Sequence, residues 1–394
     1  MTGALDGLRV LDLSRFIAGP ICGQILGDMG AEVIKVERPG GEDARFQGPF
    51  LDGESLYPMA FNRNKASVTL DTRHADAAPI LERLVSWADT LIENYRPGTL
   101  DAMGFGWARL HAAYPPLILT SLSGFGQTGP LAGRALFDPI AQAASGLMSL
   151  TGEPGRPPVL TGTYIADHVA GLYGAIGTLV ALLARAATGV GQRVDVASLD
   201  SLVSVLGTRP MAFAMLGAEP ERLGSRDPYS APANAFAAHD GFVYLHAGTD
   251  SLFPRLCSAI GRDDLVADAR YTTVDCRLAN VDALEAEVAA WTAPRTTREI
   301  EETLASAGVP CSPVASMADV VASPQLRARE MFVEVTGTYA GTAVLTGIPV
   351  KLDSTPGSIR RPPPLAGADT DRILAELVGL DEAAIVALRA SGAI

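Results

Sequence analysis

No feature of this chain limits its possible folds more than the regular alternation of β-rich runs and helical patterns over residues 1–125. The β-rich runs predict strands at 8–13, 32–37, 67–70, 90–93 and 117–122. Between them, apolar residues recur at helical spacing and predict helices at 20–29, 75–88 and 99–113. Alternation of this kind is typical of β-α-β units, and near-continuous apolar strands predict a parallel sheet covered on both faces. The expected fold class is α/β.

The pattern changes after residue 200. A long helix at 167–187 and a strand at 192–198 complete the first part, which we expect to span residues 1–200. Residues 234–247 then predict a hairpin that turns at Asp240-Gly241, and helical patterns follow near 250–260, 281–292 and 297–307. We expect a smaller α+β domain at 225–315 and a C-terminal part at 330–394 that ends in an amphipathic helix around 369–390.

The composition excludes several classes of protein. The 31 Lys and Arg against 44 Asp and Glu give a net charge of −13, without a basic run for a phosphate backbone, so nucleic acid is not an expected partner. The four cysteines form no C-x-x-C pair and the five histidines are dispersed, so no metal site is predicted. The apolar run 169–184 is about a turn short of a membrane span and predicts a buried helix. Without a signal-peptide pattern, we expect a soluble cytoplasmic protein with no membrane partner.

A glycine pattern at 124–129 fits the dinucleotide fingerprint G-x-G-x-x-G, but its context does not. Pro130 and Gly133 keep the chain in a loop where the fingerprint requires a helix. We therefore expect a mobile glycine loop after a strand and no bound nicotinamide or flavin; loops at this place often close over ligands.

Asp167 is the carboxylate that stands out on physical grounds. It directly precedes the longest apolar helix, where the free N–H groups and the helix dipole would hold its carboxylate ionised. An ordinary N-cap has the same position, and these residues alone leave both roles open.

Seven segments in a fixed order carry a family resemblance. They are LDGLRVLD at 5–12, AGP at 18–20, GAEVIKVE at 30–37, NRNK at 62–65, NYRPG at 94–98, SGFGQTGP at 123–130 and GQRVD at 191–195. Together they resemble the class III CoA-transferases, the family of the formyl-CoA:oxalate, carnitine and bile-acid CoA-transferases. The resemblance extends over nearly the whole chain.

The resemblance implies a Rossmann-like large domain built from both ends of the chain, a smaller domain between them, and an interlocked homodimer. It implies that Asp167, which matches the family's Gly-x-x-x-x-Asp position, is a nucleophile that forms an aspartyl-CoA thioester. CoA or an acyl-CoA would then be a substrate, and no prosthetic group or metal is expected. The glycine loop, with Gly126 in it, becomes a candidate for holding the carbonyl oxygen.

Alignment to the family also implies which residues contact the substrates. Residues implied along the CoA path are Ile17, Ala18, Arg38, Leu70, Arg73, Asn94, Tyr95 and, by its proximity alone, Arg96. Phe137 and Asp138 match a segment that flanks the active site, although Asp138 equally fits an N-cap before Pro139.

This chain departs from the family pattern at several positions. Ala102 and Ala135 replace basic residues, Phe137 replaces an aromatic hydroxyl, and residues 225–245 lack a glycine-rich run. Oxalate is therefore not the expected acceptor, and succinyl-CoA is the favoured donor for transfer to a small carboxylic acid.

Two alternatives remain open. An α-methylacyl-CoA racemase needs a His and an Asp as an acid-base pair, but Phe137 stands where such relatives carry the histidine, and His168 is a poor substitute beside Asp167. A non-catalytic CoA-binding protein is the other alternative, and loss of Asp167 would have been its signature.

Overall fold

A six-stranded parallel sheet organises the first of two units in the computed structural model, which describes residues 3–394. In spatial order the strands are β5 (Lys65–Thr69), β2 (Glu32–Glu37), β1 (Arg9–Asp12), β6 (Thr90–Glu93), β7 (Ile118–Ser123) and β8 (Arg193–Ala197). Every strand predicted in this part of the chain is present, within two residues of its expected bounds. The strand order reverses between β1 and β6, which is where open parallel sheets place their ligands.

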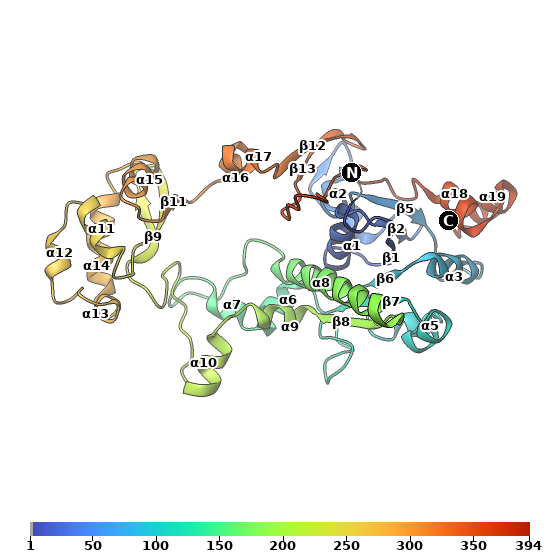
Figure 1. Ribbon diagram of the computed structural model, residues 1–394, viewed down its shortest axis with the longest axis horizontal. Helices are drawn as coiled ribbons and strands as arrows, with labels where there is room; N and C mark the ends of the chain where they lie inside the picture. The colour runs from blue at the N-terminus through green and yellow to red at the C-terminus, as the bar shows by residue number, and fades with distance from the viewer. Residues whose placement is uncertain (1–2) are drawn as a thin grey trace. The chain divides into compact units, whose positions relative to one another are not determined.

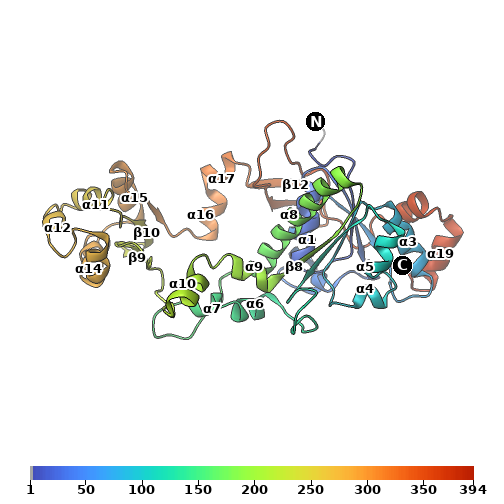
Figure 2. The same ribbon diagram turned by 60° about the horizontal axis from the view of Figure 1, so that its bottom comes forward.

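Helices cover both faces of this sheet (Figure 2). One face packs against α1 (Ala18–Asp28) and α8 (Ile165–Thr188). The other carries α3 (Ala77–Trp87), α4 (Thr99–Ala102), α5 (Trp107–Ala113) and the C-terminal helices. This first unit contains residues 1–148, 160–217 and 325–394, so both chain ends belong to it (Figure 1).

Close approach of α1 and α8 depends on glycine. A Cβ atom at Gly171 would lie 2.7 Å from the carbonyl oxygen of Ala18, and one at Gly174 would lie 2.9 Å from Leu122. The first turn of α8 is thereby held next to the start of α1, where a Cβ would not fit.

The prediction of a buried helix at 169–184 is wrong for one of its faces. Leu172, Ile176, Val180 and Leu183 of α8 point away from the sheet and are at least half exposed, whereas the opposite face is buried. The helix α8 is long and apolar enough to cross a bilayer. Core helices of soluble proteins often have the same length and composition. Contiguous exposed apolar patches are typical of surfaces that bind another molecule.

Two predicted helices are interrupted at glycines. The helix expected at 99–113 is α4 and α5, separated at Gly104, which has a φ of 81°. The helix expected at 369–390 is α18 (Thr370–Ile373), the π-helical turn η2 (Leu374–Val378) and α19 (Glu382–Ala390). There the break follows Gly379, which also has a φ of 81° and ends the first helical segment in a left-handed conformation.

Buried ion pairs hold the loops of this unit. Lys65 Nζ lies 2.8 Å from Asp12 Oδ2, and both side chains are fully buried. Arg63 and Asp28 form a second buried pair at 2.7 Å, and Asn64 joins Asp28 to the backbone of Ser358. The NRNK segment at 62–65 therefore ties the sheet to the C-terminal part of the chain.

The second unit contains residues 149–159 and 218–324. Its antiparallel sheet has the order β11 (Cys311–Pro313), β10 (Gly241–His246), β9 (Ala233–Ala238), and β9 and β10 form the predicted hairpin at Asp240-Gly241. The predicted helices are α11 (Phe253–Ala259), α14 (Val281–Thr292) and α15 (Thr297–Ser306), packed around one apolar core. The unit begins before the predicted bounds of 225–315, ends after them, and also includes residues 149–159.

The remaining elements are short. They are η1 (Asp43–Phe46), β3 (Phe50–Leu51), β4 (Glu54–Ser55), α2 (Leu56–Phe61), α6 (Asp138–Ala144), α7 (Leu147–Leu150), α9 (Ser198–Ser204), α10 (Arg209–Leu216), α12 (Asp264–Ala267), α13 (Val274–Ala279), α16 (Met317–Ala322), α17 (Pro324–Ala328), β12 (Phe332–Thr338) and β13 (Gly341–Thr346).

Candidate active site

Asp167 lines a cavity of about 230 Å³ at the carboxyl edge of the parallel sheet. The loops after β1, β6 and β7 form its walls, together with the segment before α6 and the first turn of α8. We call it the Asp167 cavity; its lining is Arg15, Phe16, Ile17, Ala18, Asn94, Tyr95, Arg96, Pro97, Ser123, Gly124, Arg134, Ala135, Leu136, Phe137 and Asp167. Its place beside β1 and β6 is the reversal point of the strand order.

Asp167 is the third residue of α8 and not its N-cap, which is Tyr164. The expectation that the helix terminus holds Asp167 ionised is also wrong. Burial and the neighbouring charge of Asp138 raise its pKa from 3.8 to about 7. The reason is that another carboxylate already occupies the free N–H groups of this helix turn.

Asp138 is that carboxylate. Its Oδ2 accepts hydrogen bonds from the backbone N–H of Ala166 at 2.6 Å and of Asp167 at 3.3 Å, and its Oδ1 accepts one from Gln142 Nε2 at 2.5 Å. It is only 2% exposed and makes no cap for α6, its own helix. Asp138 therefore caps α8 next to Asp167. The sequence left two roles open, a residue that flanks the active site and an N-cap of its own helix, and neither describes it fully.

Phe137 does line the cavity. Its ring is 65% exposed and packs edge-to-face on the ring of Phe16, with 6.1 Å between the ring centroids. These two rings form an apolar wall of the Asp167 cavity.

A second cavity of about 320 Å³ adjoins the first. Four of the residues implied in CoA binding line it, namely Arg38, Leu70, Arg73 and Tyr95, and we call it the Arg38 cavity. Arg15 and Tyr95 border both cavities, and the Arg15 guanidinium lies 5.4 Å from the centre of the Tyr95 ring. One extended ligand that crosses this pair would occupy both cavities.

The two arginines of the Arg38 cavity differ in how firmly they are held. Arg38 donates to Asp43 at 2.7 Å and to the carbonyl oxygen of Gly41 at 2.9 Å, whereas the 86%-exposed side chain of Arg73 pairs with Asp71. Both pairs are exposed enough to exchange partners with a phosphate at small cost.

Gly126 is not among the residues that line the Asp167 cavity. Gly126 borders another cavity, together with Asp195 and Ala197, and the next backbone N–H, that of Gln127, already donates to Asp195. Gly124 is the glycine of this loop that borders the Asp167 cavity.

His168 does not share the cavity with Asp167. Its Nδ1 lies 2.7 Å from the carbonyl oxygen of Tyr164, and its ring packs on Phe61 with 5.9 Å between centroids. A histidine-aspartate pair, as a racemase would need, is not formed by these neighbours.

The fold also brings residues to the site that the sequence did not indicate. Arg15 and Arg134 line the Asp167 cavity, and Tyr57 lies close enough that burial and the charge of Asp167 raise its pKa. No motif marks these positions, because they reach the site only through the folding of separate loops.

Comparisons with known proteins agree on one family. The model of CoA-transferase family III matches residues 5–370. The chain is 36% identical over 389 residues to the succinyl-CoA–D-citramalate CoA-transferase of Chloroflexus aurantiacus, covering 98% of this chain and 97% of that one. It is 38% identical over 362 residues to the acetyl-CoA:oxalate CoA-transferase of Acetobacter aceti, covering 91% and 92%.

A solved structure gives the same result. The CAIB/BAIF family protein from Brucella suis superposes with a TM-score of 0.87 at 37% identity, over 96% of this chain and 100% of that one. The chain therefore belongs to CoA-transferase family III.

Proposed function

We propose that the protein moves CoA from an acyl-CoA to a free carboxylic acid through a covalent thioester on Asp167. The observation that carries the proposal is that Arg15 and Tyr95 line both cavities. A nucleotide held near Arg38 would place the sulfur end of the same molecule beside the carboxylate of Asp167.

The chemistry follows from a nucleophilic carboxylate. An oxygen of Asp167 attacks the thioester carbonyl of the donor, CoA leaves as a thiolate, and a mixed anhydride forms. The thiolate then attacks the aspartyl carbonyl, which releases the donor acid and leaves an aspartyl-CoA thioester. The acceptor carboxylate attacks this thioester, and the returning thiolate converts the second anhydride into the new acyl-CoA and free Asp167.

The environment of Asp167 suits this role. A pKa of about 7 leaves the carboxylate ionised in about half of the molecules at neutral pH, and a more basic carboxylate is a better nucleophile. Charge develops on carbonyl oxygens in the tetrahedral intermediates, and we assign their stabilisation to the part of the glycine loop at Gly124.

We also propose that the acids carry a second carboxylate. Arg96 and Arg134 both line the Asp167 cavity, and a guanidinium group there suits a second carboxylate of the substrate. Citramalate and oxalate, which the two relatives' names contain, are both dicarboxylates. Succinyl-CoA is the donor to test first and acetyl-CoA the second.

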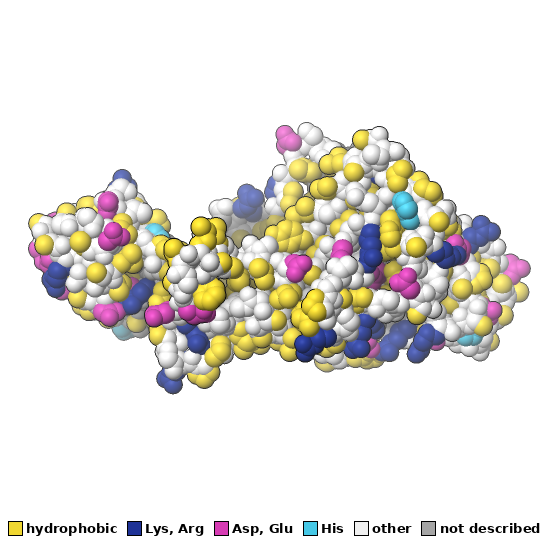
Figure 3. Space-filling model, turned by 90° about the horizontal axis from the view of Figure 1, so that it is seen from below, with side chains coloured by type: hydrophobic (Ala, Val, Ile, Leu, Met, Phe, Trp, Pro, Cys, Tyr) yellow, Lys and Arg dark blue, Asp and Glu magenta, His cyan; other side chains and the backbone are white. Residues whose placement is uncertain are grey.

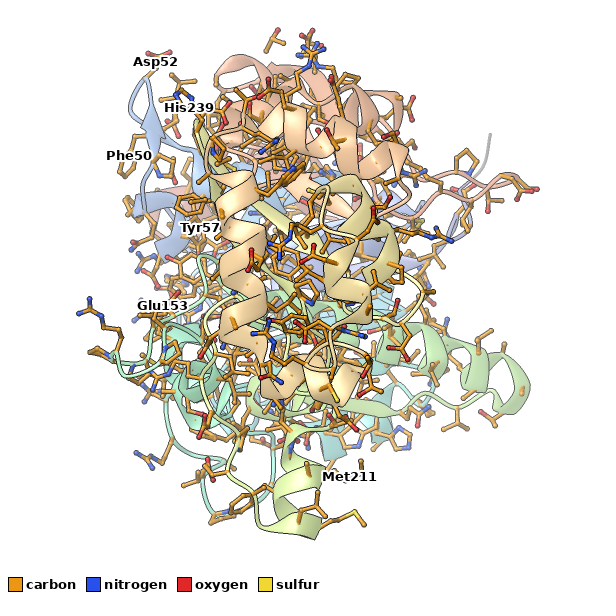
Figure 4. The ribbon with its side chains drawn as sticks, turned by 90° about the vertical axis from the view of Figure 1, so that its left-hand side faces the viewer. Phe50, Asp52, Tyr57, Glu153, Met211 and His239 are labelled. Atoms are coloured by element: carbon orange, nitrogen blue, oxygen red, sulfur yellow. The ribbon has the colours of Figure 1, made fainter. Side chains whose placement is uncertain are left out.

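The proposal includes a homodimer located in the cytoplasm, with interlocked chains. The exposed stripe of α8 supports association, as does α10, where Met215 and Leu216 are more than three-quarters exposed. Figure 3 shows hydrophobic side chains over α10, and Met211 of this helix projects outward in Figure 4.

The test is to trap the intermediate. The protein is incubated with succinyl-CoA or acetyl-CoA and quenched with hydroxylamine, which converts an aspartyl thioester or anhydride into a stable hydroxamate. Peptide mass spectrometry should find the hydroxamate on Asp167. Asp167→Ala should lose both label and transfer while it still binds CoA, and Asp200→Ala, an exposed aspartate on α9, should keep both.

A transfer-competent Asp167→Ala protein would contradict the covalent mechanism. If no acyl-CoA gives label, deuterium exchange at the α-carbon of a branched acyl-CoA decides for a racemase.

A further inference from the structure

Side chains from other elements hold the backbone of the loop between β1 and α1. The N–H of Ser14 donates to Asp12 at 2.9 Å, and the carbonyl oxygen of Ser14 accepts from Lys35 Nζ at 2.7 Å. Asn94 accepts from the N–H of Arg15 at 2.8 Å and donates to the carbonyl oxygen of Arg15 at 2.7 Å. This loop is therefore fixed before any ligand binds.

The next residue of the loop is strained. Phe16 has a φ of 64°, a left-handed conformation that is unfavourable for a residue with a side chain. Its N–H donates to Oε2 of Glu42 at 2.8 Å. A hydrogen bond to a buried carboxylate is stronger than one to a neutral acceptor, and it offsets the strain of this conformation.

Glu42 is itself anchored. It is 2% exposed, and its Oε1 forms an ion pair at 2.9 Å with the fully buried Nζ of Lys35. Burial alone would lower the pKa of Lys35, but the charges of Glu42, Asp12 and Glu37 outweigh it and raise that pKa. Lys35 is therefore cationic and fixes the carboxylate that holds Phe16.

The consequences of this contact reach the reacting end of the site. The ring of Phe16 packs on Phe137 in the wall of the Asp167 cavity, and Phe137 precedes Asp138, which caps the helix turn of Asp167. Glu42 also lines the Arg38 cavity. The buried carboxylate of Glu42 thus borders the cavity proposed for the nucleotide, and it also fixes Phe16 in the wall of the cavity proposed for the thioester.

We propose that Glu42 is a positioning residue of the transferase site, which holds Phe16 in its left-handed conformation and thereby shapes the Asp167 cavity for the thioester arm of CoA. This inference rests on the proposed function for the identity of the ligand. It assigns Glu42 no contact with the reacting atoms.

The first variant is Glu42→Gln. An amide cannot accept from Phe16 and face Lys35 at the same time, because its nitrogen would oppose one of these donors. We expect the KM for succinyl-CoA and the Kd for CoA to rise about tenfold, the size of one lost charge-assisted hydrogen bond, while kcat changes less.

A shortened substrate separates positioning from nucleotide binding. Succinyl-pantetheine lacks the nucleotide, so Arg38→Ala should leave its kcat/KM unchanged. Glu42→Gln should lower the kcat/KM of succinyl-pantetheine by the same factor as that of succinyl-CoA, because the affected wall lies at the thioester end.

Asp28→Asn is the matched control. It also breaks a buried ion pair of the sheet, that with Arg63, but contacts neither cavity. It should lower thermal stability as Glu42→Gln does and leave the Kd for CoA within twofold. Equal loss of CoA affinity in both variants would overturn the proposal and leave Glu42 a general stabiliser of the fold.

Phe16→Gly keeps the test decisive if Glu42→Gln fails to fold, since it preserves the Glu42–Lys35 pair and removes the ring. It should reproduce the tenfold loss, and in its background Glu42→Gln should have less than a twofold further effect. Wild-type CoA affinity in Phe16→Gly would also refute the proposal. CoA titrations decide this even if the wild-type protein transfers no CoA, so the two proposals fail separately.

Discussion

Two carboxylates share one helix turn at the site, and they are not equivalent. Asp138 takes the helix N–H groups and is buried, whereas Asp167 faces the cavity and lacks such donors. Burial and the charge of Asp138 therefore raise the pKa of Asp167 to about 7. Division of labour between paired carboxylates is a common way to produce one reactive group.

A pH dependence follows at this scale. Only ionised Asp167 attacks a thioester, so kcat/KM should rise from pH 6 to pH 8 with an apparent pKa near 7 in the free enzyme. Asp138→Asn removes the neighbouring negative charge and should move the rise to lower pH. Steady-state rates across this range are the measurement, and a profile that is flat from pH 5 to 8 would contradict the assignment.

Arg134 gives a prediction about specificity. If it binds the distal carboxylate of the acids, Arg134→Ala should raise the KM for a dicarboxylic acceptor about tenfold, since a charge-assisted hydrogen bond is lost. A monocarboxylic acceptor of the same length is the comparison, and its KM should not change. Arg156→Ala, an arginine of the other unit, is the control variant. An equal effect on both acids would place Arg134 on the CoA moiety.

The residues of the site were predictable from the sequence to different degrees. Asp167 was identified by resemblance, since its local pattern fits an N-cap equally well. Its raised pKa comes from burial and from the charge of Asp138, which is 29 positions away along the chain. Glu42 and Tyr57 carried no signal, because their importance lies in contacts between loops.

At the scale of elements, periodicity located the six strands of the parallel sheet and the longer helices that cover it, but not short helices such as α2, α9 and α10. Its failures have physical causes: Gly104 and Gly379 end helices that apolar spacing alone would continue. The outer face of α8 was the larger error. An apolar run does not distinguish a helix buried on all sides from one that buries half its surface and exposes the rest.

The contact of α1 and α8 predicts a sensitive glycine. Gly171→Ala would place a Cβ 2.7 Å from the carbonyl oxygen of Ala18. The free energy lost through this steric clash exceeds the free energy gained from the higher helix propensity of alanine. We expect a net loss of about 1–2 kcal/mol, observed as a fall of about 2–4 °C or more in the thermal midpoint. CoA affinity should fall too, because Ala18 lines the Asp167 cavity.

Gly133→Ala is the control for this variant, because a Cβ there would meet nothing within 4 Å. Its thermal midpoint should stay at the wild-type value. An unchanged midpoint in Gly171→Ala would mean that α1 and α8 separate freely, and the rigid placement of Asp167 inferred from their packing would be wrong.

For the whole molecule, charge and apolar surface lead to different conclusions. A net charge of −13 disfavours binding to polyanions such as nucleic acid. Several arginines nevertheless line the two adjoining cavities, which suit an anionic ligand of limited size. Several apolar side chains are exposed on each of the helices α8 and α10, and clusters of this kind are typical of interaction surfaces. A second copy of the chain is the proposed cover.

The dimer can be tested by charging its proposed interface. Wild-type protein should sediment at twice the 41.1 kDa mass of the chain, and Ile176→Glu combined with Leu183→Glu should sediment as a monomer, since burying two carboxylates in an apolar contact is too costly. Val386→Glu changes an equally exposed apolar residue on α19 and should remain dimeric. A wild-type protein that sediments as a monomer would contradict the proposed dimer. A double variant that remains dimeric would mean that the interface does not include the stripe of α8. Comparing CoA transfer in the monomeric and dimeric forms would then show whether the Asp167 cavity works within one chain.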